Sequence, residues 1–292
     1  MRLVYKNTKK QRLDYYLKDK LKDLNRSIIS KLIKNGDILV NGVKASKNGQ
    51  KVGPEDQIKI NLENLKISSN QPDFKLKIIY EDVNVVVIEK PIGLLSHSKG
   101  DYNPENSVNS LLIDKTDNLS GNRGGIVHRL DRATDGVMIY AKTENSLKYL
   151  QKLFSTRKVE KEYFAVTEGI PQEKHAIIDM PIKRDSKNPK KFVGNPEGKS
   201  AKTEYEVIEI NDSKNLALIR LKPFTGRTHQ IRVHLKSINC PIAGDQLYNF
   251  STSSKYTRMY LHAYRLSLKL PGDNNTSDFI SAIPKEFKEV LK

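Results

Sequence analysis

Apolar residues near the N-terminus recur at helical spacing, and this pattern predicts two short amphipathic helices. The first predicted helix has five such residues on one side: Leu13, Tyr16, Leu17, Leu21 and Leu24. The second is expected to begin at a cap, Ser27, and to stop before Gly36. A strand at 38–40 followed by a tight Asn41-Gly42 turn predicts a hairpin, and a further strand is predicted at 57–60.

Beyond residue 62 the pattern changes to short apolar runs of the kind that form strands. The runs predicted as strands are 76–80, 85–89, 137–141, 159–166 and 217–221. Helices are expected at 103–118 and after a capping residue, Thr143, whereas the polar stretch 180–198 is expected to be a loop. The spacing alone thus shows many short strands with a few helices.

The chain length and one polar stretch together predict two domains. A chain of 292 residues is long enough for about two domains. Residues 63–74 are polar and include Pro, Ser and Asn, so they are predicted to be a linker. The expected division is a small αβ domain over 1–62 and a larger domain over 75–292.

Charge adds a class of partner to this picture. The chain holds 51 Lys and Arg against 34 Asp and Glu, a net charge of +17. Residues 1–62 alone hold 15 Lys and Arg against 6 Asp and Glu, a net charge of +9, so the basic charge is concentrated in the small first domain. A strongly basic module of this kind is typical of proteins that bind nucleic acid, while a solvated basic surface is the plainer interpretation.

Other features of the composition exclude several classes of protein. The single cysteine, Cys240, permits neither an intrachain disulfide nor a cysteine-based zinc site. No apolar run is long enough for a transmembrane helix, and the first residues lack the apolar core of a secretory signal. We therefore expect a cytoplasmic protein with no contact to a membrane.

The most informative stretch is 124–142, which reads GGIVHRLDRATDGVMIYAK. Asp131 lies there in a polar loop directly before the predicted strand 137–141, and it is flanked by Arg129 and Arg132. Guanidinium groups on either side keep a carboxylate ionised at neutral pH, because opposite charges favour its charged form. On its own this could also be a surface loop with local ion pairs.

This stretch resembles the catalytic motif of the RluA-type pseudouridine synthases, enzymes that isomerise uridine within RNA. The resemblance rests on the run His128–Asp131, on Thr134 and Gly136, and on the apolar strand that ends at Lys142. One position differs, because Asp135 stands where the family usually has Ser. The fold that this resemblance implies is α+β, with a small αβ RNA-binding domain tethered to a catalytic domain that has a mixed, mostly antiparallel sheet.

Two later segments carry the same resemblance. Lys161-Glu162-Tyr163 matches the second motif of the family, and 225–234, which reads TGRTHQIRVH, matches the third. The resemblance implies that Asp131 acts on the ribose as nucleophile or base and that Arg227 pairs with it. It also implies that Tyr163 stacks on the uracil while the base is detached. A phenol there could also take the last proton from carbon, although its ordinary pKa near 10 would need help.

The resemblance also implies the partners of the chain. RNA is the expected substrate, and Arg129 is expected to fill the gap left when the target base leaves the stack, with Arg132 as a second RNA contact. No cofactor is expected, because the leaving group is a resonance-stabilised uracil anion. No metal is expected either, since His229 and His234 are five residues apart and do not share a helix face. We expect a monomer.

The first domain resembles the S-four-type RNA-binding domain, which is named for a small-subunit ribosomal protein. Residues 12–61 match its order of elements, including Asn25-Arg26-Ser27 and Val40-Asn41-Gly42. Its basic side chains are expected to follow RNA phosphates, which positions a protein without reading bases. Those predicted to do so are Arg12, Arg26, Lys31 and Lys34.

Two alternative functions were weighed against the synthase. A ribosome-associated RNA-binding protein without catalysis would explain the basic first domain, but it would not require Asp131, Tyr163 and Arg227 together. A protein kinase has a related His-Arg-Asp motif, but this chain lacks the glycine-rich loop, Asp-Phe-Gly and Ala-Pro-Glu. The predicted substrate is large-subunit ribosomal RNA, with transfer RNA as the alternative.

Overall fold

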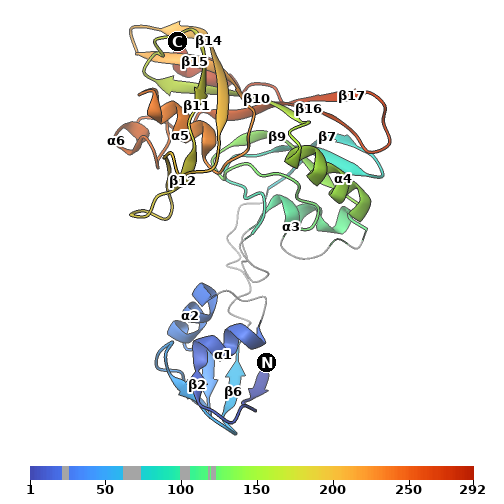
Figure 1. Ribbon diagram of the computed structural model, residues 1–292, viewed down its shortest axis with the longest axis vertical. Helices are drawn as coiled ribbons and strands as arrows, with labels where there is room; N and C mark the ends of the chain where they lie inside the picture. Colours follow the sequence, from blue (N-terminus) through green and yellow to red (C-terminus); the bar gives the residue numbers. More distant parts are fainter. Residues whose placement is uncertain (22–25, 62–73, 99–105, 118, 120–122) are drawn as a thin grey trace. The chain divides into compact units, whose positions relative to one another are not determined.

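The computed structural model describes residues 1–21, 26–61, 74–98, 106–117, 119 and 123–292. Contacts divide the chain into two compact units (Figure 1). The first comprises Met1–Asp73 with the short segments His97–Ser110 and Gly121–Arg123, and the second comprises Phe74–Ser96, Leu111–Ser120 and Gly124–Lys292. All of the predicted linker 63–74 except Phe74 lies outside the described residues. No described helix has the length and hydropathy needed to cross a membrane.

The first unit packs two helices on a small sheet, as the apolar spacing predicts. The helices are α1 (Leu13–Lys20) and α2 (Arg26–Asn35), and α2 begins one residue before the expected cap, Ser27. The sheet has the order β1-β6-β3-β4, and β2 pairs separately with β5. These strands are β1 (Arg2–Val4), β2 (Gln11–Arg12), β3 (Ile38–Val40), β4 (Val43–Lys44), β5 (Lys51–Val52) and β6 (Gln57–Ile60).

The predicted hairpin of this unit is confirmed in its turn geometry. Asn41 and Gly42 both have positive φ, 52° and 82°, which a tight two-residue hairpin turn requires. Gly36 has a φ of 78° directly after α2, so it ends that helix as expected. One buried cluster lies between helices and sheet, with Leu13, Leu17 and Ile29 fully buried in it.

The second unit is built on one nine-stranded sheet with the order β11-β14-β15-β10-β16-β9-β8-β7, and β17 pairs with β16. All neighbouring strands are antiparallel except β16 and β9, which confirms the mixed, mostly antiparallel sheet. Its strands are β7 (Lys77–Glu81), β8 (Val85–Lys90), β9 (Asp135–Ala141), β10 (Glu160–Glu168), β11 (His175–Asp179), β14 (Lys202–Asn211), β15 (Leu216–Pro223), β16 (Leu261–Lys269) and β17 (Thr276–Ile280).

Helices flank this sheet, and their starts follow local sequence signals. α4 (Glu144–Ser155) begins at the predicted cap, Thr143, whose side chain and backbone exchange hydrogen bonds with Ser146. α4 packs on β9, and α5 (Gln230–Ser237) packs on β15 (Figure 1). The remaining helices are α3 (Val108–Leu112), α6 (Phe250–Ser253), α7 (Lys285–Leu291) and the 3₁₀ turn Ile113–Lys115. The helix expected at 103–118 is thus shorter where it is described.

The expected loop at 180–198 is instead partly ordered as a second small sheet. Strands β12 (Ile182–Arg184) and β13 (Phe192–Gly194) pair as an antiparallel hairpin inside this polar stretch. Ile182 is buried and joins a small apolar cluster with Val233 of α5. The stretch contains only a few apolar residues, so the alternation of apolar and polar positions in it is too short to predict strands.

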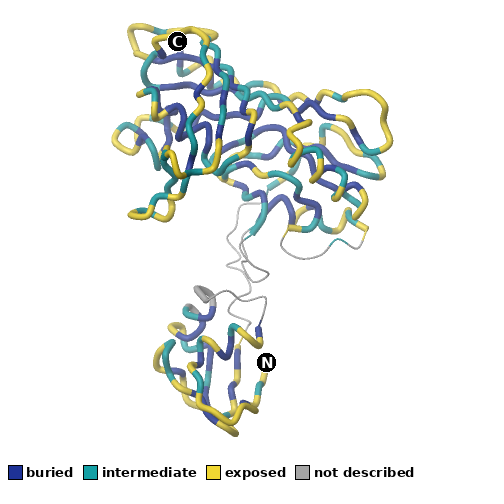
Figure 2. The backbone as a smooth tube through the Cα atoms, viewed as in Figure 1, coloured by how far each residue is buried: buried dark blue, intermediate teal, exposed yellow. Residues whose placement is uncertain are grey.

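The middle of the large sheet is its most buried part (Figure 2). The shortest strand pairing of this sheet, the joint between β9 and β16, lies there. β9 and β16 are joined through only two residue pairs, His262 with Asp135 and Ala263 with Gly136. Gly136 has a φ of 113°, and a Cβ built on it would lie 2.2 Å from the carbonyl oxygen of Ala263. Only glycine therefore allows β16 to approach β9 at this point.

Candidate active site

Asp131 lies in the loop that leads into β9, and the segment after β8 holds this loop in place. The hydroxyl of Ser96 donates to the carbonyl oxygen of Leu130 (2.8 Å) and accepts from its N–H (2.9 Å). The N–H of Gly93 donates to the carbonyl oxygen of Arg132 at 2.8 Å. The backbone on both sides of Asp131 is therefore fixed, which a side chain that must meet a substrate accurately requires.

A buried lysine holds the segment after β8 in place. Lys90 has no exposed surface, and its Nζ donates to the carbonyl oxygens of Pro91 (2.9 Å) and Leu94 (2.8 Å). Burial lowers the pKa of Lys90 to about 7, although the nearby Asp135 and Asp131 oppose that shift. Apolar spacing does not indicate this role of Lys90, because both of its partners are backbone carbonyl oxygens.

We expect Lys90→Met to lower stability in a pH-dependent way. The variant leaves two buried carbonyl groups without their donor, which should cost about 1–3 kcal/mol. Between the folded-state pKa of about 7 and the ordinary value of 10.5, the unfolded chain holds a proton on Lys90 that the folded chain lacks. The stability of the wild type relative to the variant should therefore rise with pH across this window. Urea unfolding at several pH values measures this, and a difference independent of pH would contradict it.

The first residue of the motif has a structural role. The Nε2 of His128 accepts the N–H of Ile139 at 3.1 Å, and its ring stacks on Phe154 with centroids 4.7 Å apart. Burial lowers the pKa of His128 to about 3, so the ring is neutral at physiological pH. His128 thus ties the loop to β9 and α4 rather than taking part in proton transfer.

Arg232 of α5 is the partner of Asp131. Its Nη1 donates to Oδ2 of Asp131 at 2.9 Å, while its Nε and Nη2 bind both carboxylate oxygens of Asp245 at 2.7 and 2.8 Å. Asp245 is fully buried and also accepts the N–H groups of Leu247 and Tyr248. One guanidinium is thus held by a buried carboxylate and presents its remaining edge to Asp131.

The charges of this cluster stabilise one another. Burial alone would lower the pKa of Arg232, but Asp245 and then Asp131 outweigh it, and the pKa is raised above its ordinary value. Burial alone would raise the pKa of Asp245, but Arg232 and the two backbone N–H groups hold it below its ordinary value. Both groups are therefore charged at neutral pH.

The expected pairing of Arg227 with Asp131 is wrong. Arg227 precedes α5 in a turn, and its Nε donates to the carbonyl oxygen of Ser200 at 3.0 Å. Arg232 follows it by five residues and lies on the helix, where its side chain reaches Asp131. Both arginines belong to the TGRTHQIRVH segment. Arg227 lies before the first residue of α5 and Arg232 lies within the helix, so their side chains point to different partners. Knowing that α5 starts at Gln230 would have pointed to Arg232.

His229 is a second group beside Asp131 that sequence reasoning did not assign. Its backbone has a φ of 57°, in the left-handed region, and its Nε2 lies 3.8 Å from Oδ2 of Asp131. Arg232 and His229 thus approach the same oxygen of Asp131. Within the described residues, Oδ1 of Asp131 carries no hydrogen bond, and its side chain is 18% exposed. One carboxylate oxygen is thus anchored, and the other has no hydrogen-bond partner among the described residues.

Tyr163 lies on β10 beside this carboxylate. It packs on the apolar cluster that contains Ile231 of α5 and Leu261 of β16. Burial, and then the charge of Asp131, raise its pKa above the ordinary value near 10. The surroundings therefore oppose the suggested role as the final base, because the phenol stays protonated. They suit the expected stacking role.

Exposed basic side chains lie on the loop that carries Asp131 and on the hairpin β12–β13. Arg129 and Arg132 are both exposed on the loop that carries Asp131, as an RNA contact would require. The hairpin β12–β13 adds Arg184, Lys187 and Lys190, which are exposed as well. In this unit, the described side chains thus place positive charge on the loop and on a hairpin that contacts α5.

The four RNA-binding residues predicted in the first unit differ in their surroundings. Arg12 forms a two-pronged ion pair with Asp14, with both contacts at 2.9 Å, so its charge is already compensated. Lys34 is exposed in the last turn of α2. The side chains of Arg26 and Lys31 lie outside the described part of the molecule.

Comparison with known proteins adds to this geometry. A family model described as RNA pseudouridylate synthase matches residues 84–237, and an S4 domain model matches 11–58. The chain is 36% identical to an RNA pseudouridine synthase of Aquifex aeolicus, over 96% of this chain and 92% of that protein. It is 38% identical to the ribosomal large subunit pseudouridine synthase D of Borreliella burgdorferi, over 94% of this chain and 87% of that one.

A solved structure agrees with these relatives. Human RNA pseudouridylate synthase domain containing 4 superposes with a TM-score of 0.58 at 28% identity, covering 74% of this chain and 91% of that chain. The matches favour neither a kinase nor a protein that only binds RNA. The chain belongs to the RNA pseudouridylate synthase family, and its reaction is the isomerisation of uridine to pseudouridine within RNA.

Proposed function

We propose that Asp131 performs this isomerisation through its free oxygen, Oδ1. The observation that carries the proposal is that Arg232 and His229 both approach Oδ2, while Oδ1 has no hydrogen bond among the described residues. The ion pair with Arg232 fixes the direction of the carboxylate. Oδ1 is then available as nucleophile or base toward the ribose.

The bonds of the reaction balance without any added group. The bond from the ribose anomeric carbon to N1 of uracil breaks, and a bond from the same carbon to C5 forms. The proton on C5 leaves, and N1 gains one. Tyr163 holds the detached uracil by stacking, because its phenol stays protonated. Arg129 fills the space that the flipped base leaves, at the exposed edge of the loop.

The proposed substrate is large-subunit ribosomal RNA. Support comes from relatives named ribosomal large subunit pseudouridine synthase D, which match nearly the whole chain. Such a substrate would place the protein in the cytoplasm, where ribosomes are assembled. A monomer that needs no cofactor also remains part of this proposal.

Chemical mapping of pseudouridine tests this substrate. Large-subunit ribosomal RNA and total transfer RNA from cells lacking the gene would be compared with RNA from parent cells, and each purified RNA would then be incubated with the protein. The proposal expects a site that is absent in the deletion strain and restored in large-subunit RNA in vitro. Sites that change only in transfer RNA would refute it.

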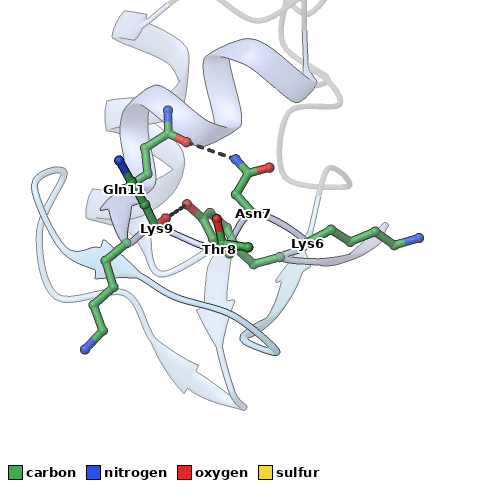
Figure 3. Close-up of a pocket in the computed structure, with 7 residues that line it drawn as sticks. Lys6, Asn7, Thr8, Lys9 and Gln11 are labelled. Atoms are coloured by element: carbon green, nitrogen blue, oxygen red, sulfur yellow. Dashed lines mark hydrogen bonds between the residues drawn. The ribbon is translucent and has the colours of Figure 1, made fainter.

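The first unit has a basic surface that can bind this RNA. Residues 5–11 line a shallow pocket (Figure 3), and three exposed lysines, Lys6, Lys9 and Lys10, belong to that segment. Tyr5 anchors the segment, since its ring packs on Tyr16 of α1 with centroids 4.7 Å apart and its hydroxyl donates to the carbonyl oxygen of Lys9. A fixed loop with exposed amines can contact phosphates with little loss of entropy. Sequence reasoning did not single out these lysines.

Replacing Lys6, Lys9 and Lys10 together by Gln should weaken RNA binding in a salt-dependent manner. If all three contact phosphates, the slope of log affinity against log salt should flatten by about 2 to 3, because each lost contact removes roughly 0.7–0.9. The rate at saturating RNA should not change. The matched control replaces three exposed lysines near the C-terminus, Lys285, Lys288 and Lys292, by Gln. Equal slopes in the two triple variants would mean that net charge, not this loop, sets the affinity.

A further inference from the structure

Tyr248 lies at the point where three parts of the site meet. It follows the buried Asp245 by three residues, and its own N–H donates to Oδ1 of that carboxylate at 3.1 Å. Its ring lies 5.0 Å from the guanidinium carbon of Arg232. The backbone and ring of Tyr248 are thus fixed by the same pair that presents Arg232 to Asp131.

The hydroxyl of Tyr248 connects the hairpin to His229. It accepts the backbone N–H of Phe192 on β13 at 2.8 Å, and it lies 2.9 Å from Nδ1 of His229. Burial raises the pKa of Tyr248 to about 12, so the phenol keeps its proton at neutral pH. Because the described residues offer the hydroxyl hydrogen no acceptor other than Nδ1 of His229, we assign the hydroxyl as the donor to that nitrogen.

This hydrogen bond determines which nitrogen of His229 carries a proton. Burial lowers the pKa of His229 more than Asp131 raises it, so the ring is neutral. A neutral ring that accepts at Nδ1 carries its hydrogen on Nε2. Nε2 is the nitrogen that lies 3.8 Å from Oδ2 of Asp131. Phe192 also contacts this ring edge-on, with centroids 5.5 Å apart.

We propose that Tyr248 is a positioning residue that holds His229 in the Nε2–H tautomer, so that His229 presents an N–H toward the Oδ2 of Asp131 that Arg232 binds and Oδ1 is directed to the ribose. This rests on the proposed role of Asp131. The opposite tautomer would present a lone pair of Nε2 to the carboxylate and repel it. The hydroxyl of Tyr248 also accepts the N–H of Phe192, so it connects the basic hairpin β12–β13 to His229. RNA that binds the hairpin therefore contacts an element that also positions the group beside Asp131.

Nitrogen NMR of the full-length protein with ¹⁵N-labelled histidine tests the tautomer directly. The chain has six histidines, and the His229→Gln variant identifies the signal of His229. The wild type should show a protonated Nε2 and an unprotonated Nδ1. Tyr248→Phe keeps the ring over Arg232 but removes the hydroxyl, so the Nδ1 signal should shift to the position of an unprotonated nitrogen that accepts no hydrogen bond. A wild-type His229 already in the Nδ1–H form, or a signal unchanged in Tyr248→Phe, would overturn the proposal.

Kinetics test the consequence for the reaction. Tyr248→Phe should lower kcat about fivefold, the effect of one lost hydrogen bond, while KM for RNA stays within about twofold. Tyr260→Phe is the matched control, since Tyr260 is a buried tyrosine in the cluster around Phe287, and its kcat should be unchanged. An unchanged kcat in Tyr248→Phe would overturn the positioning role. The NMR result does not depend on activity, so failure of the proposed role of Asp131 would be recognised separately, by an active Asp131→Asn enzyme.

Discussion

Asp131→Asn should abolish pseudouridine formation while RNA binding persists. The substitution keeps the shape of the side chain but removes the negative charge that Arg232 and His229 surround. An amide is neither a useful nucleophile nor a base, so the rate should fall by roughly a thousandfold or more. Release of tritium from RNA labelled at C5 of uridine measures the turnover, and filter binding measures the affinity.

The same experiment contains its own check. Arg129 and Arg132 stay in place beside the substituted residue, so the affinity for RNA should change by less than about fivefold. If the Asn variant kept a tenth of the wild-type rate, another residue would have to be the reacting group. A variant that lost both RNA binding and activity would point to a distorted loop. Asp131→Ser should then show the same two losses.

Arg232→Met should damage both stability and activity. Methionine fills much of the same volume, but it leaves Asp245 as an uncompensated buried charge. Removing one member of a buried ion pair costs about 3–5 kcal/mol, which thermal or urea unfolding would detect. The Asp131 carboxylate also loses its anchor, so the rate at a temperature where the variant is still folded should drop by at least about a hundredfold.

Arg227→Met is the matched control for this variant. It removes the same charge five residues earlier in the same segment, where Nε only contacts a backbone carbonyl. Its stability should stay within about 1 kcal/mol of the wild type, and its kcat should be close to normal. Equal losses in the two variants would mean that the arrangement around Arg232 does not explain catalysis.

The sequence predicted those features that depend on neighbouring residues. The cap at Thr143, the turn at Asn41-Gly42 and the strand after Asp131 are all set by local backbone preferences and apolar spacing. The motif around Asp131 was likewise readable, because its residues are contiguous. These features need no knowledge of the remainder of the fold.

The arrangement around Asp131 could not be predicted in the same way. The contact with Arg232 joins residues 101 positions apart. The resemblance was applied to Arg227, whereas the helix that starts at Gln230 brings Arg232 of the same segment to Asp131. The roles of Tyr248 and Lys90 depend on which carbonyl or nitrogen lies within hydrogen-bond distance. Such contacts follow from packing of the whole sheet, which apolar spacing does not encode.

The narrow joint between β9 and β16 has a consequence for how the enzyme matures. Asp131 precedes β9 on one side of that joint, while Arg232 follows β15 on the other side, and only two residue pairs connect the two sides of the sheet there. Neither side holds a complete set of reacting groups. During synthesis the carboxylate leaves the ribosome well before the arginine that aims it. The pair of Asp131 and Arg232 therefore exists only in a chain that has paired β9 with β16, and glycine at position 136 is what allows that pairing.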